Sequence, residues 1–129
     1  MTPEAMRYLD KAHKCLMNAR ISLSVNLTGD AGRSSYLAAF HAAQAFIFER
    51  PGKIAKSHKG VHTEFARLVR DRSELDRSLA ASLQRAYNLK VVADYETGPD
   101  SDIAPERAVG AIEDAGKFVS TVQNALTLQ

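Results

Sequence analysis

The sequence predicts an all-α fold on two observations. Apolar residues recur at intervals of three and four along most of the chain, and no stretch shows the period-two alternation of an amphipathic strand. Glycine and proline lie mostly between these periodic segments. Five helical segments with short connections indicate antiparallel neighbours, and we therefore expect a five-helix up-and-down bundle.

The first expected helix begins at the sequence TPEAM, with Thr2 as the N-cap and Pro3 at the first helical position. Its apolar stripe has spacings of three and four, through Leu9, Ala12, Leu16, Ala19 and Leu23. The stripe ends near NLTGDAG, where Gly29 and Gly32 predict a break in the chain.

The second segment, RSSYLAAFHAAQAFIFER, is apolar on almost every side, which places it at the centre of the bundle. Its alanines between Ala38 and Ala45 would let neighbouring helices approach closely. His41 and Gln44 interrupt the apolar surface, and we expect them to form a buried, hydrogen-bonded pair. The sequence PGKIAKS then ends the helix.

The remaining segments form three helices. One is expected from about His58 to Asp71, and a second starts near Ser73 and continues towards the sequence ADYE. The last follows Pro105 with an unbroken three-four alternation that runs to Leu126.

Composition predicts one globular domain over residues 1–129, because a chain of this length buries a single modest core. Hydrophobic residues make up 45% and charged residues 25%, which is ordinary for a soluble protein. The single Cys15 excludes an intramolecular disulfide and a Cys-rich zinc site. We find no signal-peptide pattern, and the longest apolar run, Tyr36 to Phe48, is too short for a bilayer. We therefore expect a cytoplasmic protein without membrane contact.

Charge is unevenly distributed along the chain. From Arg50 to Arg72 there are seven Lys and Arg residues and two acids, whereas from Ala93 to the end there are seven acids and two bases. This asymmetry is typical of an anion-binding face, and the alternative is a merely dipolar surface.

The sequence KSHKGVH carries two histidines four residues apart. His58 and His62 would share one helix face, as paired zinc ligands do, but Lys59 stands where a metalloprotease has its Glu. A lysine there disfavours a cation, so we expect no metal site. We also find no phosphate-cradling glycine loop, no Ser-His-Asp order and no carboxylate cluster, and hence expect no cofactor.

The same stretch suits a phosphate group. Ser57 can cap a helix whose first N–H groups point outward, and three lysines surround that end. The predicted phosphate-binding residues are Lys53, Lys56 and Lys59. The alternative is a solvated basic loop.

Three stretches together resemble the HEPN family of small helical domains: RSSYLAAFHAAQAFIFER, then KSHKGVHTEF, then ADYE. The resemblance implies a bundle of about five helices, often a homodimer whose cleft is lined by the fourth helices. It also implies a relation to metal-independent ribonucleases and to toxins paired with a nucleotidyltransferase antitoxin. In similar toxins, the Tyr beside the catalytic motif accepts adenylate from that partner, and Tyr95 matches this position.

The sequence departs from the motif of the family, which is an Arg followed after four to six residues by a His. When Tyr95 is aligned on the motif Tyr, Ala93 stands in place of the His and Asn88 in place of the Arg. The similar subgroup has an Arg a few residues before ADY, where this chain has Lys90.

Lys90 and Asp94 lie four residues apart and would share one helix face, in the poorer orientation for a helix pair. The family resemblance therefore makes Lys90 and Asp94 candidate catalytic residues, with His58 as the proton carrier that the motif lacks.

The sequence thus leads to one functional hypothesis and one alternative. The hypothesis is a HEPN-type protein that binds RNA or nucleotide phosphate, is the partner of a nucleotidyltransferase in a toxin–antitoxin-like pair, and has at most residual or altered ribonuclease activity. The alternative is a catalytically inactive module for dimerisation and protein interaction. Loss of the motif Arg and His leaves the question of enzyme activity open.

Overall fold

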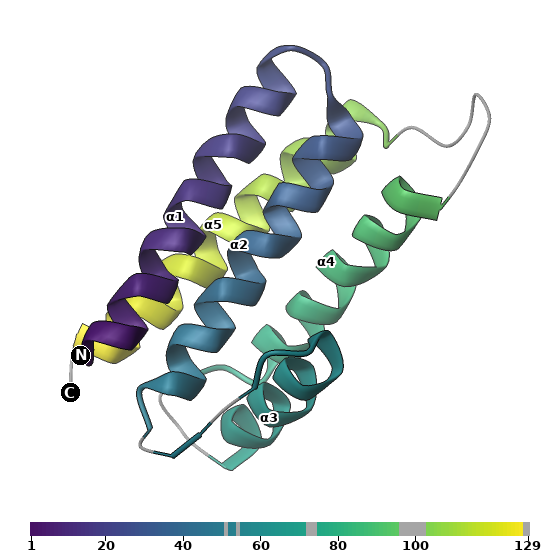
Figure 1. Cartoon of the computed structure of the whole chain (residues 1–129). Coiled ribbons are helices and arrows are strands. Elements are labelled where there is room, and N and C mark those ends of the chain that lie inside the picture. Colours follow the sequence, from purple (N-terminus) through teal and green to yellow (C-terminus); the bar gives the residue numbers. More distant parts are fainter. Residues whose placement is uncertain (51, 54, 72–74, 96–102, 128–129) are drawn as a thin grey trace.

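The computed structural model describes residues 1–50, 52–53, 55–71, 75–95 and 103–127. Over these residues the chain forms five helices and no strand: α1 (Pro3–Ser24), α2 (Thr28–Phe48), α3 (His58–Asp71), α4 (Ser78–Tyr95) and α5 (Pro105–Thr127). The four long helices alternate in direction, and the short α3 lies at one end of the bundle beside α4 (Figure 1). The predicted all-α bundle of five helices is confirmed.

The start of α1 follows from its first residues. The Thr2 hydroxyl accepts the backbone N–H of Ala5 at 3.1 Å, and Pro3 occupies the first turn. The backbone N–H of Thr2 also donates to a carboxylate oxygen of Glu49 at 2.6 Å, which joins the start of α1 to the end of α2. The predicted N-cap is confirmed.

The predicted break at Gly29 and Gly32 is wrong, because both residues lie inside α2. The turn between α1 and α2 is shorter, and Asn26 adopts a positive φ of 65° within it. At Gly32 an added Cβ would lie 2.7 Å from the Ile103 side chain. This glycine therefore allows close packing against the segment before α5 instead of ending a helix.

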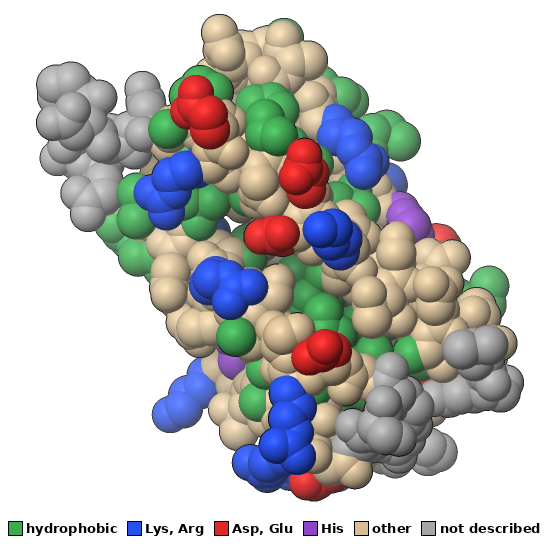
Figure 2. Space-filling view, turned by 180° about the vertical axis from the view of Figure 1, so that it is seen from behind, with side chains coloured by type: hydrophobic (Ala, Val, Ile, Leu, Met, Phe, Trp, Pro, Cys, Tyr) green, Lys and Arg blue, Asp and Glu red, His purple; other side chains and the backbone are tan. Residues whose placement is uncertain are grey.

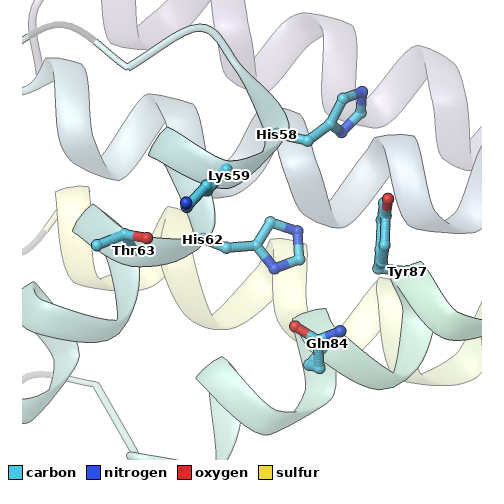
Figure 3. A pocket seen from close by; sticks show the side chains of 6 residues that line it. All are labelled: His58, Lys59, His62, Thr63, Gln84 and Tyr87. Carbon is cyan, nitrogen blue, oxygen red and sulfur yellow. The ribbon is translucent and has the colours of Figure 1, made fainter.

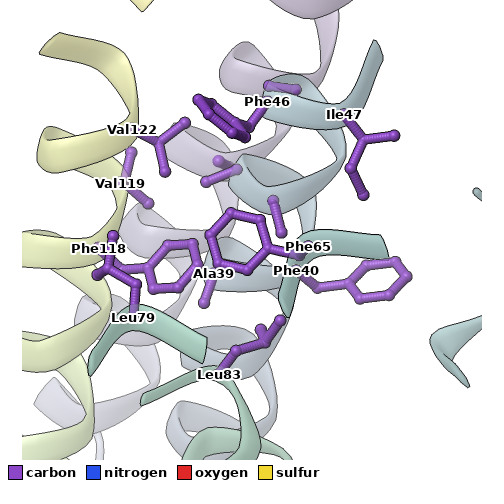
Figure 4. Packing of buried hydrophobic residues seen from close by; sticks show 14 of the residues in the cluster. Ala39, Phe40, Phe46, Ile47, Phe65, Leu79, Leu83, Phe118, Val119 and Val122 are labelled. Atoms are coloured by element: carbon purple, nitrogen blue, oxygen red, sulfur yellow. The ribbon is translucent and has the colours of Figure 1, made fainter. Parts of the chain in front are cut away.

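Helix α2 is the central element, as its sequence predicts, and it packs against each of the other four helices. The core beside it is aromatic: Phe65 of α3 lies between Phe46 of α2 and Phe118 of α5, with ring centroids 6.0 Å and 5.3 Å away (Figure 4). All three rings are fully buried. This packing holds α3 against the bundle.

Helix α4 begins at Ser78, later than the predicted start near Ser73, a residue that lies outside the described part of the chain. Leu75 is buried before the helix begins. The carboxylate of Asp76 accepts the backbone N–H of Ser78 at 2.8 Å, and such local side-chain bonds to the backbone are typical of helix starts.

The surface seen in Figure 2 has blue and red side chains interspersed, without a large area of one sign. This face therefore offers no extended cationic area to an anion. No helix in the described part of the chain is long and apolar enough to cross a membrane.

Candidate functional site

A cleft of about 320 Å³ opens between α3 and α4. Figure 3 shows its lining side chains, with His62 pointing from α3 towards Tyr87 and Gln84 on α4. The lining residues are His58, Lys59, His62, Thr63, Gln84 and Tyr87. The cleft therefore combines two imidazoles, a phenol and an ammonium group.

The floor of this region is Tyr36, a fully buried residue of α2. Its hydroxyl lies 2.7 Å from Nδ1 of His58 and 3.0 Å from Nε2 of His62. Burial raises the pKa of Tyr36 far above its ordinary value, and the nearby Tyr87 raises it further, so the hydroxyl keeps its proton. One hydroxyl thus joins both histidines of α3 to the central helix.

The roles of the ring nitrogens depend on the tautomer of each histidine, and we assign the protons in this chain of hydrogen bonds from the neighbouring groups. The Gln84 amide nitrogen donates to Oδ1 of Asn88 at 3.0 Å, so the Gln84 amide oxygen is the atom that accepts from His62. Because Nε2 of His62 faces Tyr36, the donor to Gln84 is Nδ1. His62 Nε2 is then an acceptor, and the Tyr36 hydroxyl donates to it. The hydroxyl oxygen in turn accepts from Nδ1 of His58.

This arrangement leaves Nε2 of His58 as an acceptor with no hydrogen-bond partner among the described residues. His58 is exposed, whereas His62 is half-buried. Burial lowers the pKa of His62, a hydrogen bond with Gln84 opposes this, and the nearby His58 lowers it further. His58 is therefore the imidazole that an entering ligand can reach.

Tyr87 connects this cleft with the end of α4. Its ring lies edge-on to those of Tyr36 and His62, with centroid distances of 5.3 Å and 5.5 Å. The Lys90 ammonium lies 6.0 Å from the centroid of the same ring, at the outer limit of a cation–π contact. The ring centroid of His58 lies 6.1 Å from that of Tyr87, so the predicted candidates His58 and Lys90 both lie near one aromatic side chain.

Lys90 and Asp94 form the pair that their spacing predicts, with Nζ 2.6 Å from Oδ2. Arg33 of α2 joins them, because its Nη1 donates to Oδ1 of Asp94 at 3.2 Å and to the Ala93 carbonyl at 3.1 Å. The other Arg33 nitrogen contacts Asp30. The hydrogen bond from Lys90, and then the weaker effect of Arg33, hold the pKa of Asp94 below its usual range.

Two of the three predicted phosphate-binding lysines line a second hollow. This hollow, of about 560 Å³, includes Lys53, Lys59 and Ser57, and Lys56 does not line it. Ser57 accepts the backbone N–H of Gly60 at 3.0 Å, as expected for a helix cap. Lys53 lies 3.6 Å from Glu64, so its charge is partly balanced, whereas Lys59 also borders the histidine cleft.

Tyr95 is the last residue of α4, and 75% of its surface is exposed. Its ring therefore makes little contact with the rest of the chain. The Glu96 that follows in the sequence lies outside the described residues.

Sequence reasoning missed three residues of this region: Tyr36, Gln84 and Arg33. Arg33 and Tyr36 are three residues apart at the start of the apolar segment of α2. Two polar side chains on one face of such a helix could have indicated a functional role for both residues. The polar pair expected on α2, His41 and Gln44, is hydrogen-bonded at 2.8 Å as predicted. Gln44 is buried and also donates to the Ala55 carbonyl, whereas His41 is half-buried. In the described part of the chain no three His, Cys, Asp or Glu side chains group as ligands for a metal ion.

Comparison with known proteins decides the family. The family model described as HEPN domain matches residues 5–125, nearly the whole chain. The chain belongs to the HEPN domain family. A relative from Methanocaldococcus jannaschii, named "Putative toxin MJ0605", is 28% identical over 123 residues, which cover 95% of this chain and 89% of the relative. The crystal structure of TT1696 from Thermus thermophilus has the same fold, with a TM-score of 0.77, 19% identity, and coverage of 96% of this chain and 99% of that one.

Proposed function

We propose that this HEPN protein is the toxin-type member of a two-protein pair and binds single-stranded RNA in the cleft between α3 and α4. Family membership and the name of the archaeal relative support a toxin-related role. The chemistry of the cleft supports RNA as its ligand, because aromatic rings and cations together suit bases and phosphates.

The observation that carries the proposal is the position of His58. His58 lines the cleft and is exposed, while its Nδ1 lies 2.7 Å from the Tyr36 hydroxyl, in the manner of a general base that is oriented by a second group. In RNA, His58 accepts the proton of a 2′-hydroxyl, whose oxygen attacks the adjacent phosphorus. The bond to the 5′-oxygen breaks, that oxygen takes a proton from water, and a 2′,3′-cyclic phosphate remains.

Two cationic groups flank this position. Lys59 borders the cleft on the α3 side, and Lys90 lies beyond Tyr87 on α4. A scissile phosphate beside Lys59 gains electrostatic stabilisation as negative charge develops on its oxygens, and Lys90 contacts a neighbouring phosphate of the same strand. This is how a metal-independent reaction proceeds without the Arg and His of the usual motif.

The test is cleavage of a labelled single-stranded RNA by the purified protein in the presence of EDTA. We expect His58→Gln to reduce the rate at least about 100-fold, since general base catalysis contributes roughly 10²- to 10⁴-fold. His13→Gln is the matched control, because His13 is an exposed histidine of α1 that bonds Gln123 of α5 at 2.7 Å, away from the cleft. Equal rates for the two variants would reject the catalytic proposal.

The partner that we propose is a nucleotidyltransferase antitoxin, and Tyr95 is its proposed point of modification. The exposure of the Tyr95 ring supports this, since an enzyme must reach the phenol. Co-expression with a transferase encoded beside this protein should add the mass of an adenylate, and Tyr95→Phe should abolish the addition. An unmodified mass from a co-purified pair would reject this site.

A second candidate function is a catalytically inactive dimerisation module. The observation that favours it is the partly exposed apolar surface of α4 at Tyr87, Val91 and Val92, which extends to the polar end of the helix. A two-fold homodimer through α4 would cover this surface. Light scattering at micromolar concentration tests the dimer, and a dimer without RNA binding or cleavage would favour this function.

A further inference from the structure

We infer that Arg33 and Lys90 form a binding site for a phosphate group of the RNA backbone, and that Asp94 occupies this site in the free protein. The inference rests on the proposed function, because it names residues at the end of α4 that hold the same RNA strand. It adds a residue from α2, Arg33, that the family motif and the sequence analysis do not include.

Asp94 stands where the preferences of a helix disfavour an acid. It lies in the last turn of α4, where the helix dipole repels negative charge, and it follows Lys90 by four residues, the poorer order for a helix pair. Helix stability therefore does not account for a carboxylate at this position. Its two oxygens instead contact two cations, Oδ2 with Lys90 at 2.6 Å and Oδ1 with Arg33 at 3.2 Å.

A carboxylate held by a guanidinium and an ammonium has the same contacts as a phosphate group held by them. Arg33 would keep its position if Asp94 withdrew, because it also donates to the Ala93 carbonyl and contacts Asp30. Lys90 has a second favourable contact in the ring of Tyr87, which lines the histidine cleft. Arg33 thus keeps two contacts without Asp94, whereas Lys90 keeps the longer contact with the Tyr87 ring.

The side chains of Lys90 and Asp94 are 23% and 21% exposed, so the pair lies within reach of a ligand from solvent. Because the ring centroids of His58 and Tyr87 lie 6.1 Å apart and the Lys90 ammonium lies 6.0 Å from the Tyr87 centroid, we place the scissile phosphate at His58 and a neighbouring phosphate of the same strand near Arg33 and Lys90. That phosphate takes the place of the Asp94 carboxylate. Asp94 therefore competes with that phosphate and weakens the binding of the RNA.

The experiment measures the affinity for a fluorescein-labelled 12-nucleotide single-stranded RNA by anisotropy at several salt concentrations. We expect Asp94→Asn to bind about three- to tenfold more tightly than the unchanged protein, because a competing negative charge is removed. Arg33→Gln and Lys90→Gln should each weaken binding and reduce the magnitude of the log–log salt slope by about 0.7. The double variant Asp94→Asn with Arg33→Gln should not bind the RNA more tightly than the unchanged protein.

Asp71→Asn is the matched control. Asp71 is also a surface aspartate with cationic partners, 3.7 Å from Arg67 and 3.6 Å from Arg70, and its loss changes the net charge equally. It ends α3, at the opposite end of that helix from His58. Equal affinities of Asp94→Asn and Asp71→Asn for RNA would overturn the inference, as would a gain that persists without Arg33.

Unfolding temperatures of all variants separate binding from stability, and Asp94→Ser provides a second reading if Asp94→Asn is poorly folded. The two proposals can fail separately. Tighter binding by Asp94→Asn together with full cleavage by His58→Gln would reject the catalytic proposal alone. Loss of cleavage in His58→Gln with unchanged binding by Asp94→Asn would reject the phosphate site alone.

Discussion

Replacing Tyr36 by Phe removes one hydroxyl and leaves the buried ring in place. In the folded protein this hydroxyl makes two hydrogen bonds, to His58 at 2.7 Å and to His62 at 3.0 Å. Each such bond contributes about 0.5–1.5 kcal/mol net. The exposed His58 recovers a bond to water, whereas the half-buried His62 does not, so we expect a loss of about 1–2 kcal/mol. For a chain of this length that lowers the unfolding temperature by roughly 4–8 °C.

The same substitution should affect catalysis through the orientation of His58, since Tyr36 is a positioning residue that does not contact the ligand. We expect kcat for RNA cleavage to fall about 10- to 100-fold with little change in KM, because misplacement of a catalytic group on this scale carries such a cost. Thermal unfolding and steady-state kinetics measure the two effects. Tyr8→Phe is the control, because the Tyr8 hydroxyl has no hydrogen bond to any residue in the described part of the chain. Equal stability and equal kcat for the two variants would refute the chain of hydrogen bonds.

Three further predictions concern stability and binding. Burial lowers the pKa of His41 and His62, so the unfolded state takes up protons first as the pH falls. The free energy of unfolding should therefore be highest above about pH 6.5 and decrease below it. The decrease should be smaller in His62→Gln. A urea midpoint that is unchanged between pH 7.5 and pH 5.5 would contradict this. Phe65→Ala should cost about 3–5 kcal/mol in urea unfolding because the ring is fully buried between two others, while Met17→Ala on the surface should cost less than about 0.5 kcal/mol. Lys59→Ala should reduce the salt slope of RNA binding by about 0.7, and Lys53→Ala by less, since Glu64 already balances Lys53; equal slopes would reject the role of Lys59.

The helices could be predicted from the sequence because their signals are local. The Thr2 cap, the three-four spacing and the all-round apolar character of α2 each depend on residues within a few turns. The error at Gly32 has the opposite cause. A glycine stands at position 32 because the side chain of Ile103, far along the chain, packs against it. No local sequence pattern shows that two such distant segments approach so closely.

The same distinction applies to the candidate site. The pairing of Lys90 with Asp94 is a matter of helix spacing and was predicted. Arg33, which completes that cluster, lies 61 residues from Asp94 in the sequence. Tyr36 lies 22 and 26 residues from the two histidines that it joins, and these separations carry no periodic signal. Each missed contact links two helices.

The departure of α4 from the family motif has a structural counterpart in these contacts. The motif places an Arg and a His on one helix, and this chain has Asn88 and Ala93 at those positions. A guanidinium nevertheless reaches the last turn of α4 from α2, and an imidazole of α3 lines the cleft between α3 and α4. If these groups perform the proposed chemistry, their geometry depends on how three helices pack. Phe65 and Tyr36 hold α3 against the bundle. Mild denaturing conditions that release α3 but leave α4 helical should therefore reduce the activity.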